Sequence, residues 1–244
     1  MFSNDRFEVI SQVNKWSVMD FFKAISESFY NNLIAGNSYL LIFSGVKITL
    51  IITISGLIIG TVLGALLCAM HYSGNKLLKF ISKAYIVIVR GTPILLLLML
   101  LFYVVFARSR MDAIYVAVIA FGLNSASHIA EIMKAALEAV DPGQIMAART
   151  LGFTKYGAFY HITLPQAGEY ARPVYQNAVI NLIQWTSVVG YITIADLTRV
   201  INSIGARTAD PFFVIFLGIL IYLMLAYITY LIFNMADRKK RVRR

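Results

Sequence analysis

Long apolar runs recur along the chain and are separated by short polar stretches. A helix crosses the roughly 30 Å hydrocarbon core of a membrane with about 20 residues. Five runs reach this length, at residues 40–70, 81–107, 112–133, 171–193 and 211–235. The pattern therefore predicts an all-α membrane protein with five transmembrane helices.

The fourth run differs from the others because polar residues recur inside it. They are Asn177, Asn181, Gln184, Thr186 and Ser187. Polar groups that face lipid are costly, so this helix is expected to face protein or water.

A shorter amphipathic segment precedes the first run. Apolar residues recur at helical spacing within residues 16–34, at Val18, Phe22, Ile25, Phe29 and Leu33. This spacing is typical of a helix with one apolar face, which we expect to lie on the outer membrane surface.

A polar loop interrupts the apolar runs between the third and the fourth. Its residues 144–165 read QIMAARTLGFTKYGAFYHITLP. Asp141 followed by Pro142 is a helix start, and Gly152 is a helix stop. A second short helix is predicted from Thr154 to about His161. Helices of about ten residues are marginal on their own, so another surface must hold them.

The first loop helix carries Ile145, Ala148 and Leu151 along one side. Small and apolar side chains in this arrangement suit a groove on another protein. The alternative is that they pack against the ends of the chain's own spanning helices.

The chain is 59% hydrophobic and carries a net charge of +10, from 22 Lys and Arg against 12 Asp and Glu. A basic excess can indicate a nucleic acid, an anionic membrane surface or membrane topology. Most of these cations fall in alternate connections and in the C-terminal RKKRVRR, which favours topology and no nucleic-acid partner. The positive-inside rule then places the N-terminus outside and the C-terminus in the cytoplasm.

These features divide the chain into three parts. Residues 1–37 form a periplasmic N-terminal segment with the amphipathic helix. Residues 38–237 form the transmembrane domain, which contains the polar loop at 138–165. Residues 238–244 form a basic cytoplasmic tail.

The residue types give little support to an enzyme. The single cysteine, Cys68, excludes an intrachain disulfide and a cysteine metal cluster. His71, His128 and His161 lie on different segments, and His128 with Glu131 supplies only two ligands, too few for a zinc site. We expect no catalytic residues and no bound metal, and keep an intramembrane enzyme as a minor alternative.

The polar loop resembles the cytoplasmic signature of the membrane subunits of bacterial ABC importers. That signature reads EAA, three residues, G, nine residues, I, one residue, LP. It is matched here by Ala147, Ala148, Gly152, Ile162, Leu164 and Pro165. Met146 replaces the leading Glu, which removes any salt bridge that this Glu would make.

Further segments resemble the polar amino acid branch of these permeases, which have the MetI-like type I fold. They are RGTPILL at 90–96, LNSASHIAEI at 123–132, LPQA at 164–167, TSVVGYI at 186–192 and DLT at 196–198. The resemblance covers about residues 38–240.

The resemblance implies that the helix at 142–152 is a coupling helix that docks into a separate ATPase. Its contact residues would be Pro142, Ile145, Met146, Ala147, Ala148, Arg149, Leu151 and Gly152. The chain has no GxxxxGK[ST] phosphate loop, so ATP and Mg²⁺ would be bound by the ATPase, and this chain would bind no cofactor.

The resemblance also implies the partners and the place of the protein. They are two ATPase subunits, a second permease chain (a copy or a homologue), an external amino-acid-binding protein and membrane lipid. The chain would lie in the bacterial cytoplasmic membrane as a multi-pass subunit that imports polar amino acids. An ATP-independent carrier or channel is the alternative, although neither needs a docking helix.

Two polar helix faces are candidates for the substrate pathway. Asn124, Ser127 or His128, and Glu131 share one face, and Asn177, Asn181, Gln184 and Ser187 share another. A carboxylate inside a membrane span is a functional hypothesis by default. Glu131 is expected to bind a substrate ammonium group or to act as a gate, and the alternative is a structural ion pair with Arg90 or Lys134.

Irregular backbone is predicted at two places along this pathway. Gly91 and Pro93 should break the second span beside Arg90 and Thr92, and a second irregular region is expected at Gln184, Trp185, Thr186 and Ser187. Arg90 either binds a substrate carboxylate or ends a helix near the headgroups. The predicted pathway residues are Arg90, Thr92, Asn124, Ser127, His128, Glu131, Asn181, Gln184, Thr186 and Ser187.

Overall fold

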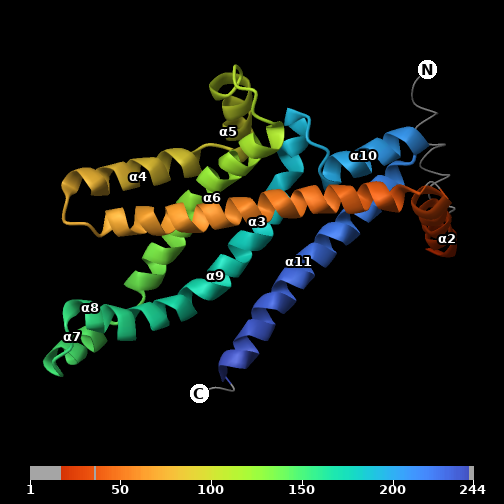
Figure 1. The fold of residues 1–244 in the computed structure, drawn as a ribbon. Coiled ribbons are helices and arrows are strands. Elements are labelled where there is room, and N and C mark those ends of the chain that lie inside the picture. Colours follow the sequence, from red (N-terminus) through yellow and green to blue (C-terminus); the bar gives the residue numbers. More distant parts are fainter. Residues whose placement is uncertain (1–17, 36, 242–244) are drawn as a thin grey trace, which may run out of the picture.

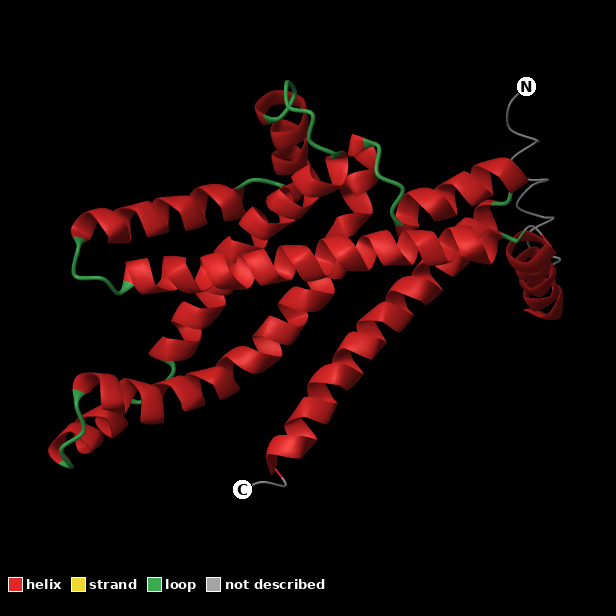
Figure 2. Ribbon diagram, in the orientation of Figure 1, coloured by secondary structure: helices red, strands yellow, loops and turns green. Residues whose placement is uncertain are grey.

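The structure is a computed structural model and describes residues 18–35 and 37–241. Figure 2 shows this part of the chain as helices joined by short loops, without a strand. The predicted all-α class is therefore confirmed for the described residues. Part of the predicted N-terminal segment (1–17) and the end of the basic tail (242–244) lie outside them.

The helices vary widely in length (Figure 1). In chain order they are α2 (Val18–Phe29), α3 (Ser38–His71), α4 (Lys76–Gly91), α5 (Ile94–Leu100), α6 (Ala113–Glu138), α7 (Pro142–Thr150), α8 (Lys155–Ala158), α9 (Leu164–Trp185), α10 (Leu197–Thr208) and α11 (Pro211–Arg241). Short π-helical turns are η1 (Tyr30–Ala35), η2 (Leu101–Val105) and η3 (Phe159–Thr163), and η4 (Thr186–Ile192) is a 3₁₀ helix.

Among the described residues, three helices are long and apolar enough to cross a membrane: Ser38–His71, Ala113–Glu138 and Phe212–Met235. Two bent helix pairs meet the same test as units, which raises the number to five if each pair is one span. Three predicted spans thus form single helices, the second is broken within its range, and the fourth is a continuous helical segment that bends against α10 at its end.

The break in the second span falls at the predicted position. The α4 helix ends at Gly91, α5 begins at Ile94, and the two segments are bent by 104°. Pro93 lacks an N–H and disfavours helical backbone at the preceding residue, so Thr92 adopts an extended conformation.

The helix type of the fourth span changes at its predicted irregular region. The α9 helix ends at Trp185, η4 continues as a 3₁₀ helix, and the whole segment Lys155–Ile192 is bent by 59° against α10. The predicted end of the second loop helix near His161 is wrong. Through η3 the chain stays helical into α9, so Pro165 follows the π-helical turn inside a continuous helical segment.

The α3 and α6 helices form the most extensive interface between helices. Gly56, Gly60 and Gly64 repeat along α3 at this interface. A Cβ at Gly60 would lie 2.5 Å from the Ser125 Cβ, and one at Gly64 would lie 3.0 Å from the Ala126 carbonyl oxygen. The glycines therefore let two backbones approach closely, as small residues do in membrane helix pairs.

The predicted amphipathic segment forms α2 and η1 and packs on the start of α11. Ring centroids of Phe29 and Phe213 are 5.5 Å apart, and those of Phe21 and Phe216 are 5.9 Å apart. Figure 1 shows α2 and α10 at one end of the molecule and α7 and α8 at the other. The position of α2 on a membrane surface stays a prediction.

Candidate functional site

A cavity of about 350 Å³ lies between α4, α6 and α9, with one residue from α3. Its walls are formed by Leu57, Arg90, Ser125, His128, Ile129, Glu131, Ile132, Ala135, Val174, Asn177, Ala178, Asn181, Leu182 and Trp185. The cavity brings together four of the predicted pathway residues, Arg90, His128, Glu131 and Asn181, from three separate helices.

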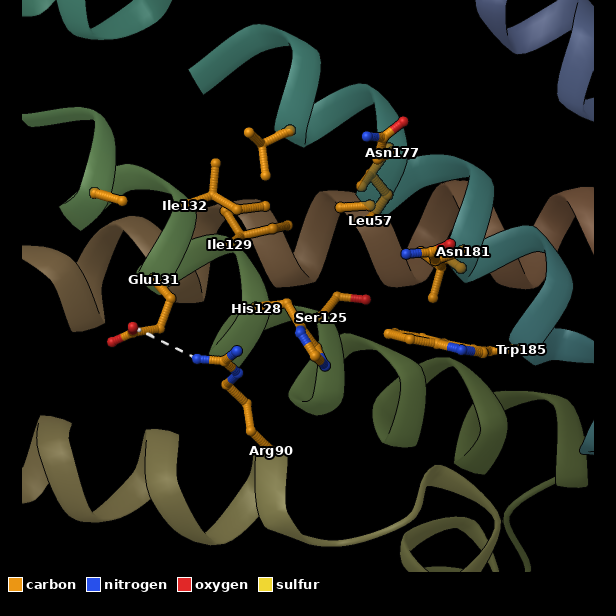
Figure 3. Close-up of a pocket in the computed structure, with 14 residues that line it drawn as sticks. Leu57, Arg90, Ser125, His128, Ile129, Glu131, Ile132, Asn177, Asn181 and Trp185 are labelled. Atoms are coloured by element: carbon orange, nitrogen blue, oxygen red, sulfur yellow. Dashed lines mark ion pairs between the residues drawn. The ribbon is translucent and has the colours of Figure 1, made fainter. Parts of the chain in front are cut away.

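The Glu131 carboxylate lies between two cations, Arg90 on the cavity wall (Figure 3) and Lys134 outside the lining. Its Oε2 is 3.5 Å from the Arg90 Nη1, and its Oε1 is 3.8 Å from the Lys134 Nζ. Both separations are longer than a charge-assisted hydrogen bond of about 2.8 Å, and all three side chains are partly exposed. Such pairs contribute about 0–1 kcal/mol, so a ligand can separate them at little cost.

The break after α4 positions Arg90. The residue is in the last turn of α4, where a cation is favoured by the negative end of the helix dipole. The chain turns away directly after it, so the Arg90 side chain is free to extend towards α6. Glu131 and Lys134 are three residues apart on α6 and therefore share a face.

The opposite wall comes from α9 and carries two amides. Asn177 and Asn181 lie one helical turn apart, are exposed, and point towards the cavity (Figure 3). Neither amide forms a hydrogen bond with another residue of the described chain. They are available to a ligand.

An aromatic pair joins the α6 and α9 walls of the cavity. The rings of His128 and Trp185 have centroids 5.0 Å apart with a 45° tilt. The sequence pattern predicted Trp185 in an irregular region but not in the pathway. The signal that pointed to it is its position one turn beyond Asn181, on the polar face of the fourth span.

Two further predicted residues of α6 are buried beside the cavity rather than on its wall. Asn124 is 3% exposed, and its Oδ1 is the buried side-chain polar atom of the described chain that lacks a hydrogen-bond partner. Ser127 is fully buried and donates a hydrogen bond to the Asn124 carbonyl oxygen at 2.7 Å.

The remaining predicted pathway residues do not line the cavity. Thr92 donates to the Ile88 carbonyl oxygen at 2.8 Å, and the buried Thr186 donates to the Ile183 carbonyl oxygen at 2.6 Å. Both hydroxyls thus satisfy backbone acceptors at the two helix breaks. Gln184 is exposed and Ser187 is partly buried, both outside the cavity wall.

The polar loop folds into a small unit at the far end of α9. The Asp141 carboxylate accepts a hydrogen bond from the Gly143 N–H at 2.8 Å, which caps α7, and Gly152 ends the turn with φ of +90°. The Gln166 Nε2 donates to the Gln144 Oε1 at 2.5 Å and ties α7 to α9. The predicted helix start and stop are confirmed.

The predicted coupling residues divide between an inner and an outer face of this unit. Ala148 is 2% exposed and packs inward, whereas Met146 is 64% and Leu151 is 80% exposed. The Arg149 Nη1 donates to the Phe153 carbonyl oxygen at 2.9 Å. Of the others, Ile145 is partly buried, and Pro142, Ala147 and Gly152 are exposed.

The described part of the chain has no group of three or more His, Cys, Asp or Glu side chains placed to hold a metal ion. The lining of the cavity combines the charged side chains of Arg90 and Glu131 with the amides of Asn177 and Asn181, a composition suited to a polar ligand with both charged and uncharged groups.

Comparison with known proteins gives matches over most of the chain. Residues 56–242 match the family described as "Binding-protein-dependent transport system inner membrane component". The chain is 32% identical to the probable amino-acid ABC transporter permease protein YckA of Bacillus subtilis (strain 168), covering 87% of this chain and 95% of YckA. It is 30% identical to the histidine/lysine/arginine/ornithine transport system permease protein HisM of Salmonella typhimurium, covering 88% of this chain and 95% of HisM.

Solved structures of ABC transporters also resemble this chain. A crystal structure of an amino acid ABC transporter with histidines has a chain that superposes with a TM-score of 0.77 at 31% identity, covering 85% of this chain and 97% of that one. The MetNI methionine ABC transporter in an inward-facing conformation gives a TM-score of 0.67 at 21% identity, which shows a shared fold.

Proposed function

Because this chain belongs to the family of binding-protein-dependent transport system inner membrane components, we propose that it is the membrane-spanning permease subunit of an ATP-driven importer of polar amino acids. The observation that carries the substrate class is the cavity, which offers a carboxylate, a guanidinium and two free amides within one bundle. Its relatives include both the histidine/lysine/arginine/ornithine permease HisM and the L-cystine permease TcyB, so they do not decide which amino acid is carried.

The proposed topology has five spans. Each bent pair would count as one, since a helix that breaks beside a cavity keeps its freed backbone groups away from lipid. The distribution of Lys and Arg supports an N-terminus outside the cytoplasmic membrane and a C-terminus in the cytoplasm.

The coupling role is assigned to α7 and the turn that follows it. Met146 and Leu151 present apolar side chains outward, at the end of the molecule that the topology places in the cytoplasm. A nucleotide-driven partner would seat this surface in a groove. Because Ala148 faces inward, the contact is proposed for the Met146 and Leu151 side of the loop.

The working assembly would contain two permease chains, two ATPases and an external binding protein. Closure of the ATPases would push on α7, and the Gln144–Gln166 hydrogen bond would transmit the displacement to α9. Since α9 also carries Asn177, Asn181 and Trp185, the movement would reshape the cavity wall directly. This is the rigid-body switch expected for alternating access.

The proposal is tested by reconstitution in proteoliposomes with a partner ATPase and an amino-acid-binding protein. We expect ATP-dependent accumulation of a labelled amino acid, and ATP hydrolysis that is stimulated by the binding protein with bound amino acid. Flux through the isolated chain without ATP would support the alternative, a secondary carrier or channel.

A further inference from the structure

The charges of the cavity are confined to one wall. Among the described lining residues, Glu131 is the one acidic side chain and Arg90 is the one Lys or Arg. They are paired at 3.5 Å, and Lys134 stands behind Glu131 at 3.8 Å. Figure 3 shows this pair on the side of α4 and α6, away from α9.

The rest of the lining has no Asp, Glu, Lys or Arg, and its one imidazole is that of His128 on α6. The α9 wall offers the amides of Asn177 and Asn181 and the ring of Trp185, and apolar side chains such as Leu57 and Ile129 fill the space between. No Asp, Glu, Lys or Arg of the described chain lines that wall. A charged group placed there would lose water without gaining an opposite charge.

We infer that the cavity selects amino acids with an uncharged side chain, and that it does so by exchanging its internal ion pair for two pairs with the substrate. This inference rests on the proposed function. The substrate ammonium group takes the place of Arg90 on Glu131, and the substrate carboxylate binds the released guanidinium. Two internal charges and two substrate charges then form two pairs, with no net charge added.

The geometry supports such an exchange. The Arg90–Glu131 contact is longer than a direct hydrogen bond and partly exposed, so it can open when a better partner arrives. A guanidinium also binds a carboxylate through two parallel hydrogen bonds, a geometry that a single 3.5 Å contact does not use.

Lys134 acts as a positioning residue. Its ammonium group lies on the other oxygen of Glu131 from the one that Arg90 contacts. It therefore holds the carboxylate in place while Arg90 leaves. It also leaves a local excess of one positive charge, which further disfavours a cationic side chain in the cavity.

One feature of the cavity favours a basic substrate. Trp185 can attract a cation over its ring face. The ring of His128, which comes from α6, already packs on Trp185 with 5.0 Å between the centroids, and no carboxylate lines the α9 wall. Competition between neutral and basic amino acids is therefore the deciding measurement.

The experiment measures direct binding to the permease–ATPase complex without the binding protein, whose own selectivity would mask that of the cavity. The probe is labelled L-glutamine, displaced by L-lysine, L-arginine, the α-amide of glutamine (no carboxylate) and glutaramic acid (no ammonium group). We expect each of the four to bind about tenfold more weakly than L-glutamine or worse. Equal displacement by lysine or arginine would overturn the inference, as would equal displacement by either truncated compound.

Variants separate the two substrate contacts. Glu131→Gln and Arg90→Gln should each weaken glutamine binding about tenfold. The matched control Lys76→Gln, on the exposed start of the same helix as Arg90, should bind as the unmodified chain does. Lys134→Gln should weaken glutamine binding. It should also reduce the ratio of the affinity for glutamine to the affinity for lysine. An unchanged affinity ratio would show that Lys134 does not disfavour lysine in the cavity.

The outcomes distinguish the two proposals. ATP-driven uptake that prefers basic amino acids would overturn this inference and leave the importer function standing. The absence of any amino acid binding, together with the absence of ATP-driven uptake, would overturn both.

Discussion

Arg90 and Glu131 come from different helices and meet across one wall of the cavity, with 3.5 Å between Nη1 and Oε2. Arg90 reaches this position because its helix ends one residue later. Glu131 reaches it because its face of α6 is turned away from the glycine-lined interface with α3. The pair joins the helix break to the centre of the bundle, so changes at either residue should affect transport more than assembly.

Glu131→Gln should reduce ATP-driven amino acid uptake about tenfold or more, because the uncharged amide cannot pair with an ammonium group. The substitution keeps the size of the side chain, so assembly with the ATPase should be unchanged. Initial uptake rates in proteoliposomes, with size-exclusion chromatography of the complex, test both statements. Unaltered uptake kinetics would remove Glu131 from the pathway.

Gly152→Leu should uncouple ATP hydrolysis from uptake. At φ of +90° a side chain costs about 1–2 kcal/mol, although no atom lies within 4 Å of the position that a Cβ would take. The strain would therefore act on the course of the loop and not through a clash. The ratio of amino acid imported to ATP hydrolysed measures the effect. Gly74→Ala, in another loop with open space and no positive φ, is the control.

Leu151→Ser should weaken binding of the ATPase by about 1–3 kcal/mol, the value of burying one leucine side chain. The residue is 80% exposed in the isolated chain, so its loss should not disturb the fold. Titration of the purified permease with the ATPase gives the affinity. Leu77→Ser, an exposed leucine on α4, should leave it unchanged. If the unmodified chain, Leu151→Ser and Leu77→Ser bind the ATPase with equal affinity, the docking surface lies elsewhere.

Gly60→Ala should lower the thermal stability of the chain. The added methyl group would lie 2.5 Å from the Ser125 Cβ and 3.2 Å from the Ala126 nitrogen, so the α3 and α6 backbones must separate. Overpacking of this kind costs about 1–3 kcal/mol. Gly168→Ala, in a helical position with no atom within 4 Å, serves as the matched comparison in the same melting assay. A melting temperature equal to that of Gly168→Ala would contradict the close-packing argument.

The attachment of α2 should weaken in acid through Asp210. Partial burial alone would raise the pKa of the Asp210 carboxyl. Hydrogen bonds from the Ser28 hydroxyl, the Phe213 N–H and the Asn32 amide outweigh burial and hold the pKa below its ordinary value. The stabilisation is therefore complete above the ordinary pKa of about 3.9 and is lost as the pH falls through the lower folded value.

Hydrogen exchange of the α2 backbone, corrected for intrinsic rates, should report this loss. Protection should be constant from pH 7 to pH 5 and fall below about pH 4. Asp210→Asn keeps the size of the side chain but removes the charge, so its protection should be lower and independent of pH in this range. Acid sensitivity that persists in Asp210→Asn would assign the effect to another group.

The local features of the fold were predictable from the sequence because they depend on neighbours in the chain. Pro93 excludes helical backbone before it, Asp141 with Pro142 starts a helix, and Gly152 accepts a positive φ, wherever the surrounding helices lie. The helical period likewise placed Glu131 and Asn181 on polar faces. The continuous helix from Lys155 into α9 escaped prediction, because a π-helical turn carries the chain past a proline that normally marks a boundary.

Tertiary packing decided which member of each polar face reaches the cavity. Asn124 and Glu131 share a face of α6, yet only Glu131 lines the wall, whereas Asn124 is buried in the bundle at 3% exposure. Trp185 lines the site and its neighbour Gln184 does not, since adjacent residues of an α-helix point about 100° apart. The helical repeat of polar residues in a sequence specifies the direction of their side chains around the axis of their own helix. The approach of Arg90 and Lys134 to the same carboxylate depends on where two axes cross, which no single segment encodes.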